Sequence, residues 1–281
     1  QTSASRSFSI TVQNNAPSNH FNTVIYTGTG TSGGDIQNIT GVGFSPGLTW
    51  VKNRSFALNH YLYDSIRGTG AAKALHSNNT DSEASGSTYS ANGGVSSFSS
   101  DGFGAYRGSD NTYQGTNMNG QNYVSWNFKA GGAAVENTDG TINSQVSVNN
   151  SLGFSIVSWT GNGNDATVGT GLGQQAELVI TKGTANLATY NSWVTYHTDL
   201  STNYHLYLNT ADSQQNGQGN YFRDSAFTSE VFGVGDDVYG PNVSGTNMIA
   251  YCFTSKPGFS KVSYYTGNGS ANGPMVQTGF E

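Results

Sequence analysis

The stretch FSIVSWTGNG, Phe154–Gly163, decides the fold. Its apolar and aromatic residues alternate with small polar ones and stop at Thr-Gly-x-Gly, which is the pattern of a β-strand that runs into a turn. The same pattern occurs as FNTVIYTGTG at Phe21–Gly30 and, one residue longer, as FSKVSYYTGNG at Phe259–Gly269. One kind of strand used three times predicts a repeated β architecture.

Two further blocks repeat in the same order along the chain. GVGFSPGLTWVK at 41–52 matches GLGQQAELVITK at 171–182, which aligns Leu48 with Leu178 and Lys52 with Lys182. NYVSWNF at 122–128 matches NMIAYCF at 247–253. Blocks that recur at offsets of 125 to 133 positions predict two homologous units.

These repeats divide the chain into five predicted parts. We expect β-sandwich units at 18–130 and 153–257, separated at 131–152 by a linker or an exposed hairpin. Residues 1–17, with Phe8, Ile10 and Val12 alternating, resemble the end of a preceding β domain or a linker strand. Residues 258–281 resemble the start of a third unit or a closing strand. The pattern therefore predicts a segment of a longer, modular polypeptide.

The composition predicts an all-β protein of tandem antiparallel β-sandwich units, of the jelly-roll or lectin-like kind. Of the 281 residues only 10% are charged, against about 25% in a typical domain, while 38 Gly, 16 Tyr and 14 Phe favour strands and turns. A net charge of −6 with 11 Lys and Arg argues against nucleic acid as a partner. No apolar run approaches the ~20 residues of a membrane span, so no membrane insertion is expected. Cys252 is the only cysteine, and we expect it to be a buried hydrophobe.

Taken together, the blocks resemble a known family. TGTG, GFSPGLTWVKNRS, HYLYDSIRG, FSSDGF, NGQNYVSWNFKAGG, NTDGTINSQVSVN and GFSKVSYYTGNGSANGP are similar to a repeat domain of unknown function in tail-fibre and other virion proteins of marine bacteriophages, cyanophages especially. The resemblance covers about Phe21 to Glu281 and implies a concanavalin A-like sandwich of the lectin and glucanase type. It supplies no catalytic residues. The second unit departs from the pattern at GLGQQAELVI, where a proline is expected before the strand.

The resemblance and the repeats together lead to a functional hypothesis. We expect a structural and adhesive component of a phage virion appendage, such as a tail fibre, located on the virion or outside the cell. Its loops would make weak, multivalent contacts with cell-surface polysaccharide. The expected partners are other copies of the chain, as a trimer or polymer, and other virion proteins. The alternatives are a spacer or capsid decoration without a ligand, a bacterial extracellular adhesin or filament subunit, and a glycan depolymerase.

Nothing in the sequence indicates an enzyme. The five glutamates are isolated from one another, whereas sandwich glucanases place paired carboxylates on one strand. Tail-spike hydrolases can assemble such pairs from distant strands, so the depolymerase alternative stays open. Asp64 and Arg67 are close enough in sequence to form a structural salt bridge across a turn.

The candidate glycan-binding residues are aromatic, amide and acidic side chains that can stack on a sugar and bind its hydroxyl groups. Alternation in NSWVTYHTD predicts Trp193 and His197 on one strand face, pointing outward if Val194 and Tyr196 point inward; alternatively Trp193 packs in the core. Trp50, Trp126 and Trp159 are expected in the core. The loop candidates, where the two units differ, are Tyr106, Tyr113, Asp237, Tyr239 and Asn242.

One loop could also hold a metal ion. GVGDDVYGPN at 233–242 offers the carboxylates of Asp236 and Asp237, with the Asn242 side chain nearby, and oxygen ligands of this kind suit Ca²⁺. The alternative is an ordinary solvated hairpin turn. No other cofactor is expected.

Overall fold

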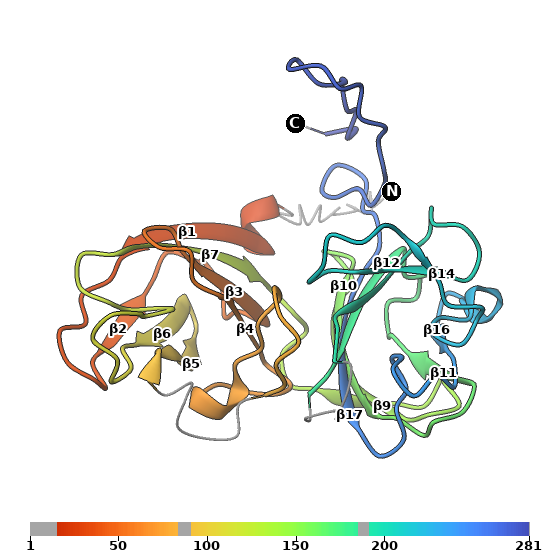
Figure 1. The fold of residues 1–281 in the computed structure, drawn as a ribbon, viewed down its shortest axis with the longest axis horizontal. Coiled ribbons are helices and arrows are strands. Elements are labelled where there is room, and N and C mark those ends of the chain that lie inside the picture. Colours follow the sequence, from red (N-terminus) through yellow and green to blue (C-terminus); the bar gives the residue numbers. More distant parts are fainter. Residues whose placement is uncertain (1–15, 84–90, 185–190, 281) are drawn as a thin grey trace, which may run out of the picture.

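The computed structural model describes residues 16–83, 91–184 and 191–280. Within these residues the chain is all-β, with several antiparallel sheets and short 3₁₀ helices, which confirms the predicted all-β class (Figure 1). Phe8, Ile10 and Val12, on which the predicted N-terminal strand depends, lie outside the described residues. In the described part of the chain no helix has the length and apolar character needed to span a bilayer.

The first half of the molecule, β1 to β7, pairs a four-stranded sheet with a three-stranded one. The strand orders are β1-β7-β3-β4 and β2-β6-β5. Alternate residues of the two sheets, including Val51, Tyr63, Phe103 and Tyr123, form a buried core between them. The elements are η1 Pro17–Asn19, β1 Phe21–Thr27, β2 Ile36–Ile39, β3 Leu48–Asn53, β4 His60–Asp64, η2 Ala71–Lys73, β5 Gly94–Ser99, β6 Gly102–Tyr106 and β7 Asn122–Phe128.

The second half, β8 to β17, pairs an eight-stranded sheet with a two-stranded one. The strand orders are β15-β14-β13-β12-β17-β10-β9-β8 and β11-β16. Trp159, Val179, Phe232 and the buried Cys252 belong to the core between these sheets. The elements are β8 Val135–Asn137, β9 Ser144–Asn149, β10 Phe154–Thr160, β11 Ala166–Gly169, β12 Leu178–Gly183, β13 Val194–His197, β14 Tyr204–Tyr207, β15 Gln215–Asn216, η3 Asp224–Ala226, β16 Val231–Val234 and β17 Asn247–Phe253.

The repeated blocks pair in the same register in both halves. Phe21 lies opposite Phe128 in the first half, as Phe154 lies opposite Phe253 in the second. Leu48 likewise pairs with Phe128, and Leu178 pairs with Phe253. The positions that the sequence repeat aligns therefore occupy corresponding places in two sheets.

The regions outside the repeated blocks behave differently from one another. For residues 131–152 the sequence left two alternatives, a linker or an exposed hairpin. The structure has the hairpin of β8 and β9 there, and this hairpin extends the eight-stranded sheet. Residues 258–280 contain no strand; Phe259 still packs against His20, and the segment after it extends away from the sheets (Figure 1), with Tyr264, Tyr265 and Met275 exposed. Of the two alternatives for 258–281, the start of a third unit or a closing strand, a closing strand is not formed within the described residues.

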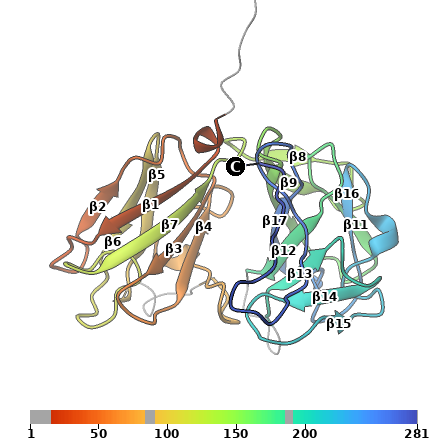
Figure 2. The same cartoon turned by 90° about the horizontal axis from the view of Figure 1, so that it is seen from above.

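A third apolar cluster joins the two halves, and we call it the seam. It combines Leu48, Leu62 and Leu75 of the first half with Phe154, Ile156, Trp193, Ile249 and Tyr251 of the second. The ring of Phe128 lies 5.3 Å from that of Phe154 and 5.8 Å from that of Phe253. In the view from above, β4 is the strand of the first sheet nearest β17, and β1 is farther from it (Figure 2).

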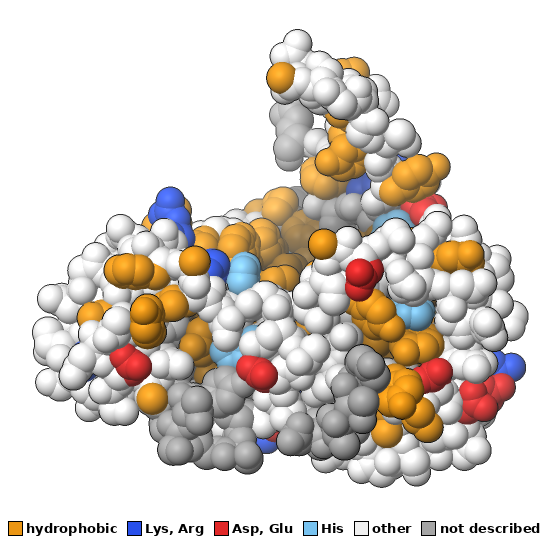
Figure 3. Space-filling view, viewed as in Figure 1, with side chains coloured by type: hydrophobic (Ala, Val, Ile, Leu, Met, Phe, Trp, Pro, Cys, Tyr) orange, Lys and Arg blue, Asp and Glu red, His pale blue; other side chains and the backbone are white. Residues whose placement is uncertain are grey.

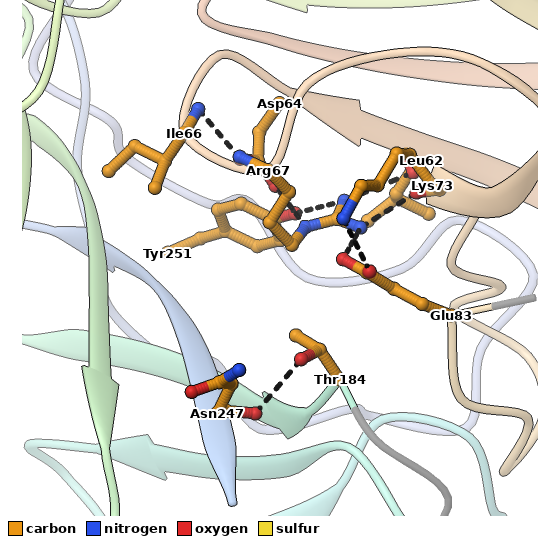
Figure 4. Close-up of polar contacts among 9 residues, drawn as sticks. All are labelled: Leu62, Asp64, Ile66, Arg67, Lys73, Glu83, Thr184, Asn247 and Tyr251. Atoms are coloured by element: carbon orange, nitrogen blue, oxygen red, sulfur yellow. Dashed lines mark hydrogen bonds and ion pairs between the residues drawn. The ribbon is translucent and has the colours of Figure 1, made fainter.

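A buried ion-pair network closes one side of the seam (Figure 4). Arg67 Nε lies 2.5 Å from Asp64 Oδ2 and its Nη1 lies 3.1 Å from Glu83 Oε1, which confirms the predicted Asp64–Arg67 salt bridge. Tyr251 of the second half donates its hydroxyl to Asp64 Oδ2 at 2.8 Å. Burial alone would lower the pKa of Arg67, but the charge of Asp64 raises it above its ordinary value, so the guanidinium stays charged.

Candidate functional site

Three loops of the first half meet around a surface groove of about 350 Å³. They are the loop between β3 and β4, the segment before β5 and the loop between β6 and β7. Loops on a rigid sheet framework are where recognition usually lies. The residues that line the groove include Leu58, Asn59, Tyr61, Asn92, Asp110 and Tyr113.

The third loop is fixed by hydrogen bonds to its neighbours. Gln114 donates Nε2 to the carbonyl oxygens of Ala91 at 2.8 Å and of Asp110 at 2.6 Å. The Gly115 N–H donates to the carbonyl oxygen of Asn92 at 2.8 Å. A Cβ atom at Gly115 would lie 2.1 Å from the Tyr61 ring, so only glycine lets this loop pack on the floor of the groove.

Asp110 holds Tyr113 in place and supplies the carboxylate of the groove. Its Oδ1 accepts the backbone N–H groups of Thr112 and, at 3.0 Å, Tyr113. These two hydrogen bonds lower the pKa of Asp110, so the carboxylate is ionised at neutral pH. The Tyr113 side chain stays 53% exposed beside it.

The groove combines the groups that a sugar requires. Tyr113 offers an exposed aromatic face for the apolar side of a pyranose ring. Asp110 and the amides of Asn59 and Asn92 offer acceptors and donors for hydroxyl groups. Asn59 Oδ1 accepts a hydrogen bond from Asn78 at 2.8 Å, while no described residue accepts from Asn59 Nδ2.

In each half, a buried asparagine side chain bonds to the backbone of the Thr-Gly-x-Gly turn. Asn117 Oδ1 accepts the N–H groups of Thr29 and Gly30 at 2.9 and 3.1 Å. Asn242 Oδ1 accepts the N–H group of Asn162 at 3.2 Å, and its Nδ2 donates to the carbonyl oxygen of Asn164. Both side chains are fully buried.

The glycines of these turns allow the same close approach. A Cβ atom at Gly28 would lie 2.3 Å from the Met118 carbonyl oxygen, and one at Gly161 would lie 2.2 Å from that of Val243. The signal was present in the sequence, because the offset of 125 between NYVSWNF and NMIAYCF continues upstream and aligns Asn117 with Asn242. These asparagines hold the framework together.

A family model covers this whole architecture, matching residues 16–281. The chain belongs to the family described as Domain of unknown function (DUF7483). No curated protein and no solved structure matches the chain. The function of this DUF7483 domain therefore has to be argued from its own residues.

Among the predicted glycan-binding residues, the DUF7483 domain brings only Tyr113 to the groove. Tyr106 is half-buried at the end of β6, where burial raises its pKa to about 12. Tyr239 is exposed on a loop of the second half, and Asp237 Oδ1 accepts its N–H group at 2.7 Å. Asn242 is buried and bonded to Asn162 and Asn164, so the prediction that it faces a ligand is wrong.

The predicted outward face of the 191–199 stretch is also corrected. Trp193 has no exposed surface, and its Nε1 donates to the His76 carbonyl oxygen at 2.7 Å across the seam. The alternative that it packs in the core is the one observed. His197 is half-buried, with Nδ1 3.7 Å from Asp199 Oδ2. The predicted outward face does not meet solvent because the first half, including the segment around His76, packs against it.

The two carboxylates proposed for Ca²⁺ lie on the loop after β16. Asp236 is exposed, whereas Asp237 closes an Asx turn onto Tyr239. No group of three or more His, Cys, Asp or Glu side chains suited to a metal ion occurs among the described residues. Calcium binding here stays a prediction.

The groove residues missed from the sequence were Asp110, Asn59 and Asn92. A signal for Asp110 existed, since an aspartate two and three residues before Thr112 and Tyr113 is typical of an Asx turn. For Asn59 and Asn92 there was no such signal, because their loops are brought together only by the pairing of β3 with β4 and of β5 with β6.

Proposed function

We propose that this DUF7483 domain is a rigid adhesive module that binds cell-surface glycans weakly through the Tyr113 groove and gains affinity from many copies. The observation that carries the proposal is the exposed Tyr113 ring beside the ionised Asp110 and two asparagine amides. This set of groups suits a neutral or amino sugar better than an apolar ligand. Each contact would be weak, and display on one particle would raise the effective concentration of the others.

The construction of the groove supports this role. Its loops are bonded to each other through Gln114 and Asp110, so a sugar would meet a preorganised surface and little ordering entropy would be lost on binding. The seam joins the two halves through a shared apolar core and the buried Arg67 network. One molecule would therefore behave as a rigid bead.

The setting that we propose is a phage virion appendage such as a tail fibre. It is supported by the resemblance of the repeated blocks to a domain found in virion proteins. A bacterial extracellular adhesin or filament would use the same groove in the same way. Detecting the protein in purified particles or on bacterial surfaces distinguishes these settings.

Glycan hydrolysis fits the groove less well than binding. Retaining and inverting glycosidases use two carboxyl groups that flank the scissile bond. Among the described residues that line the groove, Asp110 supplies the only carboxylate, and its Oδ1 already holds the loop. A bound glycan would therefore remain intact, and release of reducing ends from a bound polysaccharide would contradict this.

A glycan array tests the proposal when the protein is displayed in multiple copies on streptavidin. We expect wild type to bind a defined set of bacterial surface glycans. Tyr113→Ala should weaken that binding about fivefold, since one stacked ring contributes about 1 kcal/mol. Asp110→Asn keeps an oxygen for the turn and removes the charge, so it should weaken binding without lowering the melting temperature.

The matched control is Tyr264→Ala, which removes an exposed tyrosine that does not line the groove. It should bind as wild type does. No binding to any glycan, in a protein that is folded and displayed, would support the spacer alternative. Binding that survives Tyr113→Ala but is lost with Tyr239→Ala would move the site to the second half.

A further inference from the structure

A second cleft, of about 930 Å³, lies where the two halves meet, and we call it the junction cleft. The first half contributes the loop between β2 and β3, the residue before β1 and the segment after β7, and the second half contributes the turn between β9 and β10. Ligand sites typically have volumes of about 300 to 1,000 Å³ and often lie between domains. The junction cleft therefore has room for a ligand of several rings.

Hydrogen bonds hold the walls of the junction cleft in place. The Gly47 N–H donates to the Phe128 carbonyl oxygen at 2.8 Å. The Lys129 N–H donates to the His20 carbonyl oxygen at the same distance. Asn149 of the second half donates Nδ2 to the Lys129 carbonyl oxygen at 3.0 Å. The backbone of Lys129 is therefore fixed from both halves, while its side chain stays exposed at the cleft.

Two glycines let the walls approach each other closely. A Cβ atom at Gly47 would lie 2.2 Å from that of Ala130. One at Gly131 would lie 2.3 Å from the Val148 carbonyl oxygen of the second half. A larger residue at either position would push the segments apart, so the shape of the junction cleft depends on these glycines.

The junction cleft carries a positive charge that no acidic group offsets. Lys129 is the only Lys, Arg, Asp or Glu among the described residues that line it, and its ammonium group forms no ion pair with a described residue. Asp101 lies nearby in sequence, but its carboxylate accepts the N–H groups of Gly41 and Gly43 at 3.0 and 2.6 Å. Burial, and then the charge of Lys129, lower the pKa of His20, so this ring is neutral at neutral pH.

This local charge contrasts with the rest of the molecule. The chain has 17 Asp and Glu against 11 Lys and Arg. On the face drawn in Figure 3 the charged side chains are scattered and do not gather into a basic patch. The field of the whole protein therefore does not attract anions, and an anionic ligand has to be recognised at a local site.

The corresponding place in the second half is filled by an acidic side chain. The sequence repeat aligns Gly47 with Glu177, and the Glu177 N–H donates to the Phe253 carbonyl oxygen as that of Gly47 does to Phe128. The Glu177 side chain, which Gly47 lacks, accepts the Ser255 N–H at 2.5 Å. The second half thus has a carboxylate where the first half has open space.

The nearby cation also differs between the halves. Lys129 corresponds to Thr254, whose N–H donates to the Gly153 carbonyl oxygen just before β10. The lysine that follows in the second half, Lys256, bonds to the side chain of Gln174. One half therefore has a carboxylate and a bonded lysine, and the other has an unpaired lysine and no acid. This difference favours a negatively charged ligand in the first half.

We propose that the junction cleft binds an acidic sugar, with the carboxylate of a uronic acid residue at the Lys129 ammonium group. Sugar hydroxyl groups bond to Ser45 and Asn150, which are exposed in the cleft. One lysine matches the single charge of a carboxylate, whereas the arginine fork that suits phosphate is absent from the described lining. The Tyr113 groove has its own carboxylate, Asp110, and disfavours such a ligand. The junction cleft is therefore a second site with a different sugar preference, and it does not depend on the groove.

Isothermal titration calorimetry of the full chain with trigalacturonate tests the proposal. Wild type should bind it, and the affinity should fall as salt is added because the contact is ionic. The methyl ester of trigalacturonate keeps the rings without the charge and should bind about tenfold more weakly. Lys129→Gln, at an exposed position, should weaken trigalacturonate binding by a similar factor.

Two control variants and a second readout locate the site. Lys256→Gln removes the lysine of the second half and should bind trigalacturonate as wild type does. Tyr113→Ala should also bind it as wild type does, which separates the junction cleft from the groove. In an NMR titration the pKa of His20 should rise when trigalacturonate is bound, because the carboxylate offsets the charge of Lys129.

Several results would overturn the proposal. Wild type that is folded and does not bind trigalacturonate would do so, as would equal affinity in Lys129→Gln or for the methyl ester. Inorganic phosphate that displaces trigalacturonate at equal concentration would show a site for any anion and would contradict a sugar site. Binding that is lost in Tyr113→Ala and kept in Lys129→Gln would place the acidic sugar in the groove, which supports the proposed function and contradicts this inference.

Discussion

The two halves of the molecule share a pairing register and differ in the environment of one face. Phe21, Leu48 and Phe128 have the same neighbours in the first half as Phe154, Leu178 and Phe253 have in the second. Yet Trp126 is half-exposed, whereas Tyr251 at the corresponding position is buried beside Asp64 and Arg67. The strand pattern therefore determines which residues share a face, and docking between sheets determines which face meets solvent.

The largest expected effect comes from breaking the ion-pair network that closes the seam. Arg67→Met leaves Asp64 buried without its cation, and we expect a loss of about 3–5 kcal/mol in the free energy of unfolding. Urea denaturation measures it. The matched control is Arg223→Met in the second half, because the Arg223–Asp165 pair is largely exposed. That change should cost less than about 1 kcal/mol, and equal losses in the two variants would contradict the buried network.

Acid should destabilise both halves through buried histidines. Burial lowers the pKa of His76 and of His205 to about 4, below the ordinary value of 6.5. The unfolded chain therefore binds more protons between pH 6.5 and 4, so stability is complete above pH 6.5 and falls as the pH approaches 4. Each histidine accounts for about 3 kcal/mol across this window.

His205→Phe isolates the second half in this pH series. The His205 ring stacks on Tyr221 at 4.1 Å, and phenylalanine keeps that contact without titrating. Urea denaturation at several pH values between 7 and 4.5 should show about half of the histidine-dependent loss in this variant. A variant with the full wild-type loss would show that His205 is not buried in its neutral form.

The buried asparagines Asn117 and Asn242, which bond to the Thr-Gly-x-Gly turns, offer a test in which the two halves should respond alike. Asn117→Ala leaves the N–H groups of Thr29 and Gly30 without their acceptor, and Asn242→Ala does the same to the N–H group of Asn162 and removes the donor to the Asn164 carbonyl oxygen. Each change should cost about 2 kcal/mol. Thermal unfolding should show similar losses for both. If Asn242→Ala left the melting temperature unchanged, the turn in the second half would not depend on the hydrogen bonds of Asn242.

The smallest expected effect concerns the corresponding lysines Lys52 and Lys182. Lys182 is almost fully buried, and this burial lowers its pKa to about 7, whereas Lys52 is half-exposed. The unfolded chain then binds the extra proton between pH 7 and the ordinary value of 10.5, so stability should rise with pH in this range. The contribution is about 1 kcal/mol per pH unit.

Lys182→Met should remove this slope between pH 7 and 9, and Lys52→Met should keep most of it. The readout is the slope of the free energy of unfolding against pH, which does not depend on the absolute stability of either variant. An unchanged slope in Lys182→Met would contradict a buried, neutral Lys182.

The sequence predicted those features that depend on neighbours along a strand. The all-β class, the salt bridge between Asp64 and Arg67 and the burial of Cys252 and Trp159 follow from alternation, short spacing and residue type. Alternation could not show that the first half covers Trp193 while Trp50 and Trp126 stay half-exposed. That difference arises from contacts more than a hundred residues apart.

The candidate groove shows the same division. Tyr113 was identified from its place in a variable, polar loop, and Asp110 fits a local turn pattern. The meeting of these residues with Asn59 and Asn92 depends on loop positions that the sheets determine. Local sequence patterns therefore indicate Tyr113 and Asp110, whereas only the fold shows that Asn59 and Asn92 lie beside them.

Hydroxyl-radical footprinting of the four tryptophans, read by mass spectrometry on dilute protein, tests the contrast between the halves most directly. Trp50 and Trp126 are half-exposed on the first sheet, whereas Trp159 lies in the second core and Trp193 is fully buried in the seam. We expect Trp50 and Trp126 to be oxidised several-fold faster than Trp159 and Trp193. Oxidation of Trp193 as fast as that of Trp126, in the folded protein, would contradict the seam and with it the account of the two faces.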